Sequence, residues 1–126
     1  KKCEFIAGDV KQYLADAQSE KKKFDVIILD PPAFVKDRHK VAEGMVGYKK
    51  INEAALRILS ADGILVSASC SAHVSLLDFR HMLTESAGRA RRTLQVLETY
   101  THGIDHPELT AFTEGEYLKC LFALAS

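Results

Sequence analysis

Two side chains in this sequence are suited to covalent chemistry and stand where α/β proteins bind their ligands. Asp30 follows the apolar run 26–29, and Cys70 follows a second apolar run that begins at Ile64. Apolar runs without polar alternation are typical of parallel strands that are buried on both faces. Ligands bind at the carboxyl ends of such strands. The sequence therefore predicts a reactive site that contains a carboxylate and a thiol.

The local sequence sets both residues apart from their neighbours. Pro31 and Pro32 fix two φ angles and lack N–H donors, so the turn that carries Asp30 is stiff and ends the strand. Cys70 lies between two serines and ahead of a predicted helix N-terminus, a position that favours a thiolate. Cys3 and Cys120 lie within predicted strands, and we expect both in the core.

The predicted elements place Asp30 and Cys70 at one edge of a sheet. The apolar periodicity gives the order β-α-β-α-β-α-β-β, with strands at 3–7, 24–30, 64–69, 93–101 and 117–124, and helices at 10–17, 48–59 and 76–88. Strands 24–30 and 64–69 are sequential and parallel, so we expect them to be neighbours. Asp9 is a predicted N-cap whose capping box is completed by Gln12. Residues 36–40 form a polar loop, for which contact with a phosphate is one interpretation and a solvated loop the other.

Composition limits the classes of function. The chain has 126 residues, enough for one domain, and a hydrophobic fraction of 47% that is sufficient for a core. Its net charge of zero argues against a self-sufficient nucleic-acid binder. Three cysteines without CxxC spacing suggest neither disulfides nor a metal site, and no apolar run is long enough for a membrane span. We expect a cytoplasmic protein with reduced thiols.

Six short motifs, taken together, resemble one family of enzymes. They are Asp30-Pro31-Pro32-Ala33-Phe34, Gly47-Tyr48-Lys49-Lys50-Ile51-Asn52, Gly63-Ile64-Leu65, Ser69-Cys70-Ser71, Asp105-His106-Pro107 and Glu114-Gly115-Glu116-Tyr117-Leu118-Lys119. In this order they resemble the C-terminal part of the bacterial 23S ribosomal RNA (cytosine-5) methyltransferases of the RlmI type. The first motif also resembles motif IV of the class I methyltransferases that use S-adenosylmethionine (SAM) to modify nucleobases.

The resemblance implies a fold, a cofactor and a set of roles. The fold is the Rossmann-like class I methyltransferase fold, with a mostly parallel sheet and a final antiparallel strand. Cys70 is the implied nucleophile that adds to C6 of cytosine, while Asp30 holds the N3/N4 edge of the base. The resemblance implies SAM contacts for Asp9, Asp30 and Pro31, and RNA contacts for Pro32, Phe34, Lys36, Tyr48, Lys49 and His106.

Part of that fold is not seen in the sequence. There is no Gly-x-Gly turn to hold SAM, and residue 3 begins what resembles the third strand. We therefore interpret residues 1–126 as the C-terminal part of a catalytic domain, inactive alone, with the first two strands missing. The family strand order 3-2-1-4-5-7-6 would leave strand 24–30 at an edge. We expect strand 3–7 to pair with that edge, or two chains to associate across it as a homodimer.

Three other functions stay open. Amino-group methyltransferases share Asp-Pro-Pro but need no cysteine, which Ser69-Cys70-Ser71 argues against. RNA uracil-5 methyltransferases share the strand-end Ser-Cys and have a later His-x-Glu, which His106-Pro107-Glu108 resembles faintly. A catalytically silent α/β interaction module is the third alternative.

Overall fold

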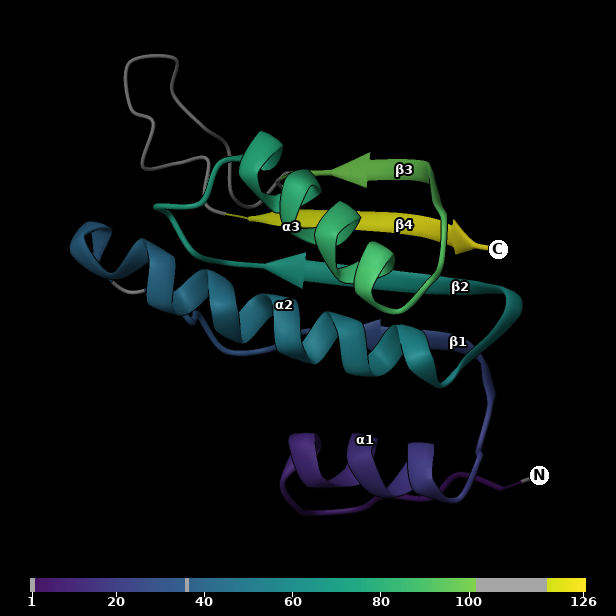
Figure 1. The fold of residues 1–126 in the computed structure, drawn as a ribbon. Coiled ribbons are helices and arrows are strands. Elements are labelled where there is room, and N and C mark those ends of the chain that lie inside the picture. Colours follow the sequence, from purple (N-terminus) through teal and green to yellow (C-terminus); the bar gives the residue numbers. More distant parts are fainter. Residues whose placement is uncertain (1, 36, 102–117) are drawn as a thin grey trace.

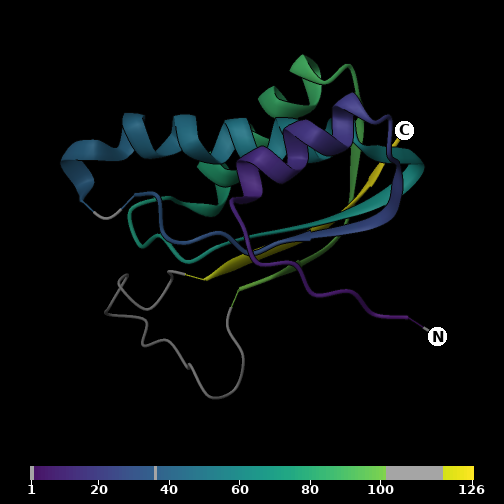
Figure 2. The same ribbon diagram turned by 90° about the horizontal axis from the view of Figure 1, so that it is seen from below.

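The fold is a single sheet with helices on one face. The computed structural model describes residues 2–35, 37–101 and 118–126. Within them the elements are α1 (Val10–Ser19), β1 (Phe24–Leu29), the 3₁₀ turn η1 (Arg38–Lys40), α2 (Val41–Arg57), β2 (Leu59–Ser69), α3 (Leu76–Arg89), β3 (Leu94–Tyr100) and β4 (Lys119–Ala125). Figure 1 and Figure 2 show α1, α2 and α3 together on one side of the sheet.

The sheet has the strand order β1-β2-β4-β3. β1 and β2 are parallel neighbours, and β4 is antiparallel to both β2 and β3. β1, β2 and β3 therefore run in one direction and β4 runs against them (Figure 1). This arrangement confirms the predicted mostly parallel sheet with a final antiparallel strand, and it confirms that the strands preceding Asp30 and Cys70 are adjacent.

The hydrophobic core lies between the helices and the sheet face that they cover. Leu56 and Phe79 from α2 and α3 pack there with Leu65 and Leu121 from the strands, and all four are almost fully buried. The opposite sheet face is open in the described chain. Val26 and Ile28 of β1 are 54% and 70% exposed, so the prediction that this strand is buried on both faces is wrong for the described residues.

The predicted strand 3–7 is also wrong. Residues 2–9 form no strand, and Phe5 is 94% exposed because no partner strand pairs with this segment in the described chain. Cys3, expected in the core, is therefore exposed. Asp9 does cap α1, since its carboxylate accepts a hydrogen bond from the Lys11 amide.

Two local details differ from the sequence prediction. Gln12 does not complete a capping box, because its side-chain amide donates to Asp16 within the helix.

α2 begins at Val41 rather than at Tyr48, so Gly44 and Gly47 are helical. A Cβ on Gly44 would lie 2.7 Å from the Phe34 carbonyl oxygen. Glycine at this position allows the loop after β1 to pack against the helix.

Candidate active site

Asp30 and Cys70 both lie at the carboxyl edge of the sheet. Leu29 is level with Ser67 in the β1–β2 pair, so Asp30 follows at the level of Ala68 and Cys70 lies two residues farther along. Leu29, Ser69 and Ser71 are buried on the helix side, whereas Asp30 and Cys70 are exposed. By the alternation of an extended chain, both functional side chains belong to the open face.

Cys120 lies on the same face as Asp30. It is opposite Ala68 in the β2–β4 pair, and its thiol is only partly buried. The prediction that Cys120 belongs to the core is therefore wrong, because Lys119, Leu121 and Ala123 are the β4 residues that face the helices. Burial raises the pKa of Cys120, and the nearby negative charge of Asp30 raises it further. Cys120 is consequently a neutral thiol at pH 7.

A buried hydrogen-bond cluster supports Cys70 from the helix side. Tyr48 of α2 has no exposed surface, and its hydroxyl lies 2.6 Å from Ser71 Oγ. Ser69 Oγ donates to the Tyr48 hydroxyl at 2.9 Å and accepts from the Ser71 amide at 3.2 Å. The serines on either side of Cys70 are thus fixed by one tyrosine and by each other.

The same cluster joins the two loops that carry the functional residues. The Val35 amide, in the loop after Asp30, donates to Ser71 Oγ at 3.3 Å. Asn52 of α2 donates to the Tyr48 carbonyl oxygen at 2.8 Å and accepts from Ser67 of β2 at 2.7 Å. Because every partner is buried, these bonds are shielded from competing water.

Lys119 completes the cluster from β4. It is 2% exposed, and its ammonium donates to the Ser71 carbonyl oxygen at 2.7 Å. Burial lowers the pKa of Lys119, and the interaction with Cys70 acts in the opposite direction. Lys119 belongs to one of the six motifs, but its sequence pattern predicts no role for it. Which side of β4 faces the helices depends on its place between β2 and β3, and the sequence of the strand alone does not reveal it.

Several residues predicted to contact RNA take part in packing within the chain. The rings of Phe34 and Tyr48 meet edge to face, with centroids 4.8 Å apart, and no substrate can touch the buried Tyr48 ring directly. Lys49 is half-buried and pairs with Glu85 of α3. Pro31 is buried, while Pro32 remains exposed beside Asp30. Lys36 and His106 lie outside the described residues.

A cavity of about 400 Å³ opens next to the loop after β1. Its walls come from Phe34, the η1 region and the first turns of α2, and they are lined by Phe34, Asp37, Lys40, Glu43, Gly44 and Gly47. The charged lining has both signs. The cavity is therefore no simple phosphate pocket, although Lys40 offers one cation to a nucleic-acid backbone.

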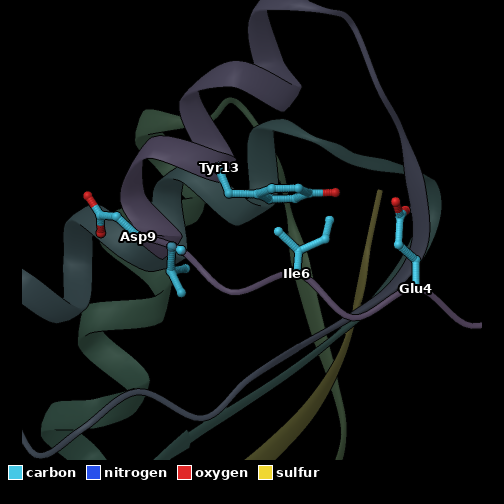
Figure 3. A pocket seen from close by; sticks show the side chains of 6 residues that line it. Glu4, Ile6, Asp9 and Tyr13 are labelled. Carbon is cyan, nitrogen blue, oxygen red and sulfur yellow. The ribbon is translucent and has the colours of Figure 1, made fainter.

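Asp9 lies beside a second, smaller hollow between residues 4–8 and α1. This hollow has a volume of about 220 Å³ and is lined by Glu4, Ile6, Gly8, Asp9, Val10 and Tyr13. Figure 3 shows the Tyr13 ring over Ile6, while the Asp9 carboxylate points away from them. α1 begins on the side of the sheet where β1 and β2 end (Figure 1), so Asp9 lies on the same side as Asp30.

Neither a metal-ligand cluster nor a membrane-crossing helix occurs in the residues that the structure describes. They contain no group of three or more His, Cys, Asp or Glu side chains able to hold a metal ion. Among the helices of the described ranges, none has the length and apolar character needed to cross a membrane.

Curated relatives match almost the whole chain. It is 42% identical over 118 residues to ribosomal RNA large subunit methyltransferase I of Serratia proteamaculans, and 40% identical to the protein of that name from Yersinia pseudotuberculosis. The resemblance predicted from the sequence is confirmed. Each match covers 94% of this chain and 30% of the relative, so the chain spans less than a third of the methyltransferase I proteins that it resembles.

Solved structures show the same fold. SMU.776, assigned as a methyltransferase and crystallised with SAH, superposes with a TM-score of 0.79 at 22% identity over 93% of this chain and 30% of its own. A protein from Streptococcus mutans assigned as a SAM-dependent methyltransferase gives 0.77 at 22% identity, covering 93% of this chain and 29% of that one. No family model matches the chain.

Proposed function

We propose that residues 1–126 form the base-binding part of the catalytic domain of a SAM-dependent methyltransferase. Its target is C5 of a cytosine in 23S ribosomal RNA. The proposal rests on one observation: Cys70 and Asp30 are both exposed, and they follow the carboxyl ends of two adjacent parallel strands. The likeness to ribosomal RNA large subunit methyltransferase I supports the substrate class.

The proposed chemistry begins with Cys70. C5 of a pyrimidine is a weak nucleophile, and addition of the Cys70 thiolate to C6 forms a carbon–sulfur bond that makes C5 electron-rich. Asp30 holds the N3/N4 edge of the base and stabilises the adduct. After C5 has accepted a methyl group, a base removes the C5 proton. The carbon–sulfur bond then breaks, which restores the C5–C6 double bond and the thiolate.

SAM would supply the electrophilic methyl group and leave as its thioether. This chain offers residues that suit part of such a cofactor. The hollow beside Asp9 has apolar walls from Ile6 and Val10, which suit a flat ring. Asp9 then has two roles, as N-cap of α1 and as cofactor contact.

A covalent trapping experiment tests the proposed nucleophile. The full-length protein is incubated with SAM and RNA carrying 5-fluorocytidine at the target, where fluorine blocks the loss of the C5 substituent. We expect an adduct that survives denaturing electrophoresis, and we expect Cys70→Ala to abolish it.

Cys120→Ala and Cys3→Ala are the matched controls, since both are free cysteines. Each should retain the adduct. An adduct that persists in Cys70→Ala would refute the assigned nucleophile. A 5-fluorouridine RNA that is trapped in place of the cytidine analogue would change the substrate from cytosine to uracil.

A further inference from the structure

The buried cluster beneath Cys70 is more elaborate than packing requires. We call Tyr48, Ser69, Ser71 and Lys119 the Tyr48 network. The Tyr48 hydroxyl accepts a hydrogen bond from Ser69 and forms a second one with Ser71 Oγ, 2.6 Å away. Ser71 Oγ also accepts a hydrogen bond from the Val35 amide. Each hydroxyl of the cluster therefore has a buried partner.

Lys119 is the unusual member of the network. A lysine is rarely buried in a protein interior, because removing an ammonium from water is costly. A neutral side chain would fill this space without that cost. Yet Lys119 is 2% exposed, donates to the carbonyl oxygen of the residue after Cys70, and interacts electrostatically with Cys70 itself.

We propose that Lys119 is a positioning residue for Cys70. It holds the carbonyl oxygen of Ser71, the residue after Cys70, while Tyr48 and the two serines fix the backbone on either side of Cys70. Ser71 also bonds to the Val35 amide, so the network keeps the Cys70 loop and the Asp30 loop in a constant relation. A role of Lys119 in catalysis rests on the proposed function. The first test does not, because it measures only the reactivity of the Cys70 thiol.

That test measures the reactivity of the thiol without RNA or SAM. The full-length protein is treated with iodoacetamide between about pH 6 and about pH 9, and alkylation of the Cys70 peptide is followed by mass spectrometry. We expect Lys119→Met to slow alkylation of Cys70 at neutral pH by about tenfold, because the variant lacks both the ammonium and its hydrogen bond to the Ser71 carbonyl oxygen. Asp30, Tyr48 and Cys120 are the titratable groups of β1, α2 and β4 near this edge, and they are unchanged in the variant.

Arg92→Met is the matched control. Arg92 is also a partly buried cation bonded to backbone carbonyls, including those of Leu59 and Ala125, but these lie at the other end of β2 and β4. The variant should leave the Cys70 profile unchanged. A folded Lys119→Met protein whose Cys70 is alkylated like the wild type would overturn the proposal.

Two further variants keep the test decisive if Lys119→Met does not fold. Lys119→Gln retains a hydrogen-bond donor without the charge, and the same slower alkylation is expected. Tyr48→Phe removes one hydroxyl, and we expect kcat to fall several-fold with KM for RNA unchanged. Normal alkylation in Lys119→Gln would overturn the proposal. If Lys119 variants alter thiol reactivity while Cys70→Ala still methylates RNA, the proposed function fails and the inference about Lys119 stands.

Discussion

At the scale of single residues, the alternation around Cys70 separates a reactive side chain from the groups that support it. Ser69 and Ser71 point into the polar cluster, and Cys70 between them is exposed. Asp30 is likewise exposed between two buried neighbours, Leu29 and Pro31. The exposed pair was predictable, because an apolar run followed by a reactive residue marks the end of a buried strand. The supporting partners were not, since Tyr48 and Lys119 approach from distant parts of the chain.

Asp30→Asn tests whether the exposed carboxylate acts on the base. In the full-length protein we expect turnover to fall by about 10²-fold or more, as for other groups that take part in proton transfer or charge stabilisation. SAM affinity should remain close to that of the wild type, because the proposed role of Asp30 is to hold the base. Single-turnover methylation and calorimetry measure the two quantities. Turnover within a few fold of the wild type would contradict the role of Asp30.

Gly44→Ala tests the close contact between α2 and the loop that carries Asp30. An added Cβ would lie 2.7 Å from the Phe34 carbonyl oxygen, so we expect a loss of about 1–3 kcal/mol in the free energy of unfolding. Gly88→Ala is the control, because a Cβ at Gly88 in α3 has no neighbour within 4 Å. Better helix propensity should stabilise that variant by up to about 1 kcal/mol. Urea denaturation measures both, and equal effects would refute the packing argument.

At the scale of elements, the regular segments were well predicted and the irregular ones were not. α1, α3 and β1 follow directly from apolar periodicity, and so does the second half of β2. The start of β2 at Leu59 was missed, because residues 60–63 look like a turn. α2 was predicted too short because Gly44 and Gly47 look like loop residues, whereas the helix needs them for contact with Phe34. Residues 3–7 have the composition of a strand but no partner in the described chain. A strand depends on its neighbours for hydrogen bonds, which a local pattern cannot supply.

Arg92 connects three elements near the start of β3. Its guanidinium donates to the carbonyl oxygens of Leu56 and Leu59 at 2.7 and 2.6 Å, and to those of Ser60 and Ala125 at 2.8 and 3.2 Å. The end of α2 is thereby joined to β2 and β4. We expect Arg92→Met to lower the free energy of unfolding by about 2–3 kcal/mol, in line with hydrogen bonds from a charged donor. A Tm equal to that of the wild type in calorimetry would show that the bonds contribute nothing.

At the scale of the whole molecule, β1 leaves one edge and one face of the sheet uncovered. Within the described residues β1 pairs only with β2, and Val26 and Ile28 are exposed on the open face. Unpaired strand edges with apolar side chains recruit other chains. We therefore expect residues 1–126, produced alone, to sediment as a dimer or larger species and to bind no SAM in calorimetry at millimolar ligand.

Ile28→Lys provides the control for that association. A lysine on the open face of an edge strand discourages pairing, and the variant should sediment as a monomer. A wild-type chain that is monomeric and binds SAM with micromolar affinity would contradict both the association and the interpretation of residues 1–126 as part of a catalytic domain.

The alternation of β4 has a consequence for how this sheet tolerates mutation. Lys119 and Cys120 are adjacent in sequence, yet one belongs to the buried network and the other to the open face. Substitutions on the open face can therefore alter the surroundings of a substrate while the hydrogen bonds behind it stay intact. A deletion of one residue in β4 would have the opposite result, since it would exchange the two faces. If the proposed function holds, point substitutions on the open face can change base specificity, whereas a one-residue deletion within β4 would also break the Tyr48 network.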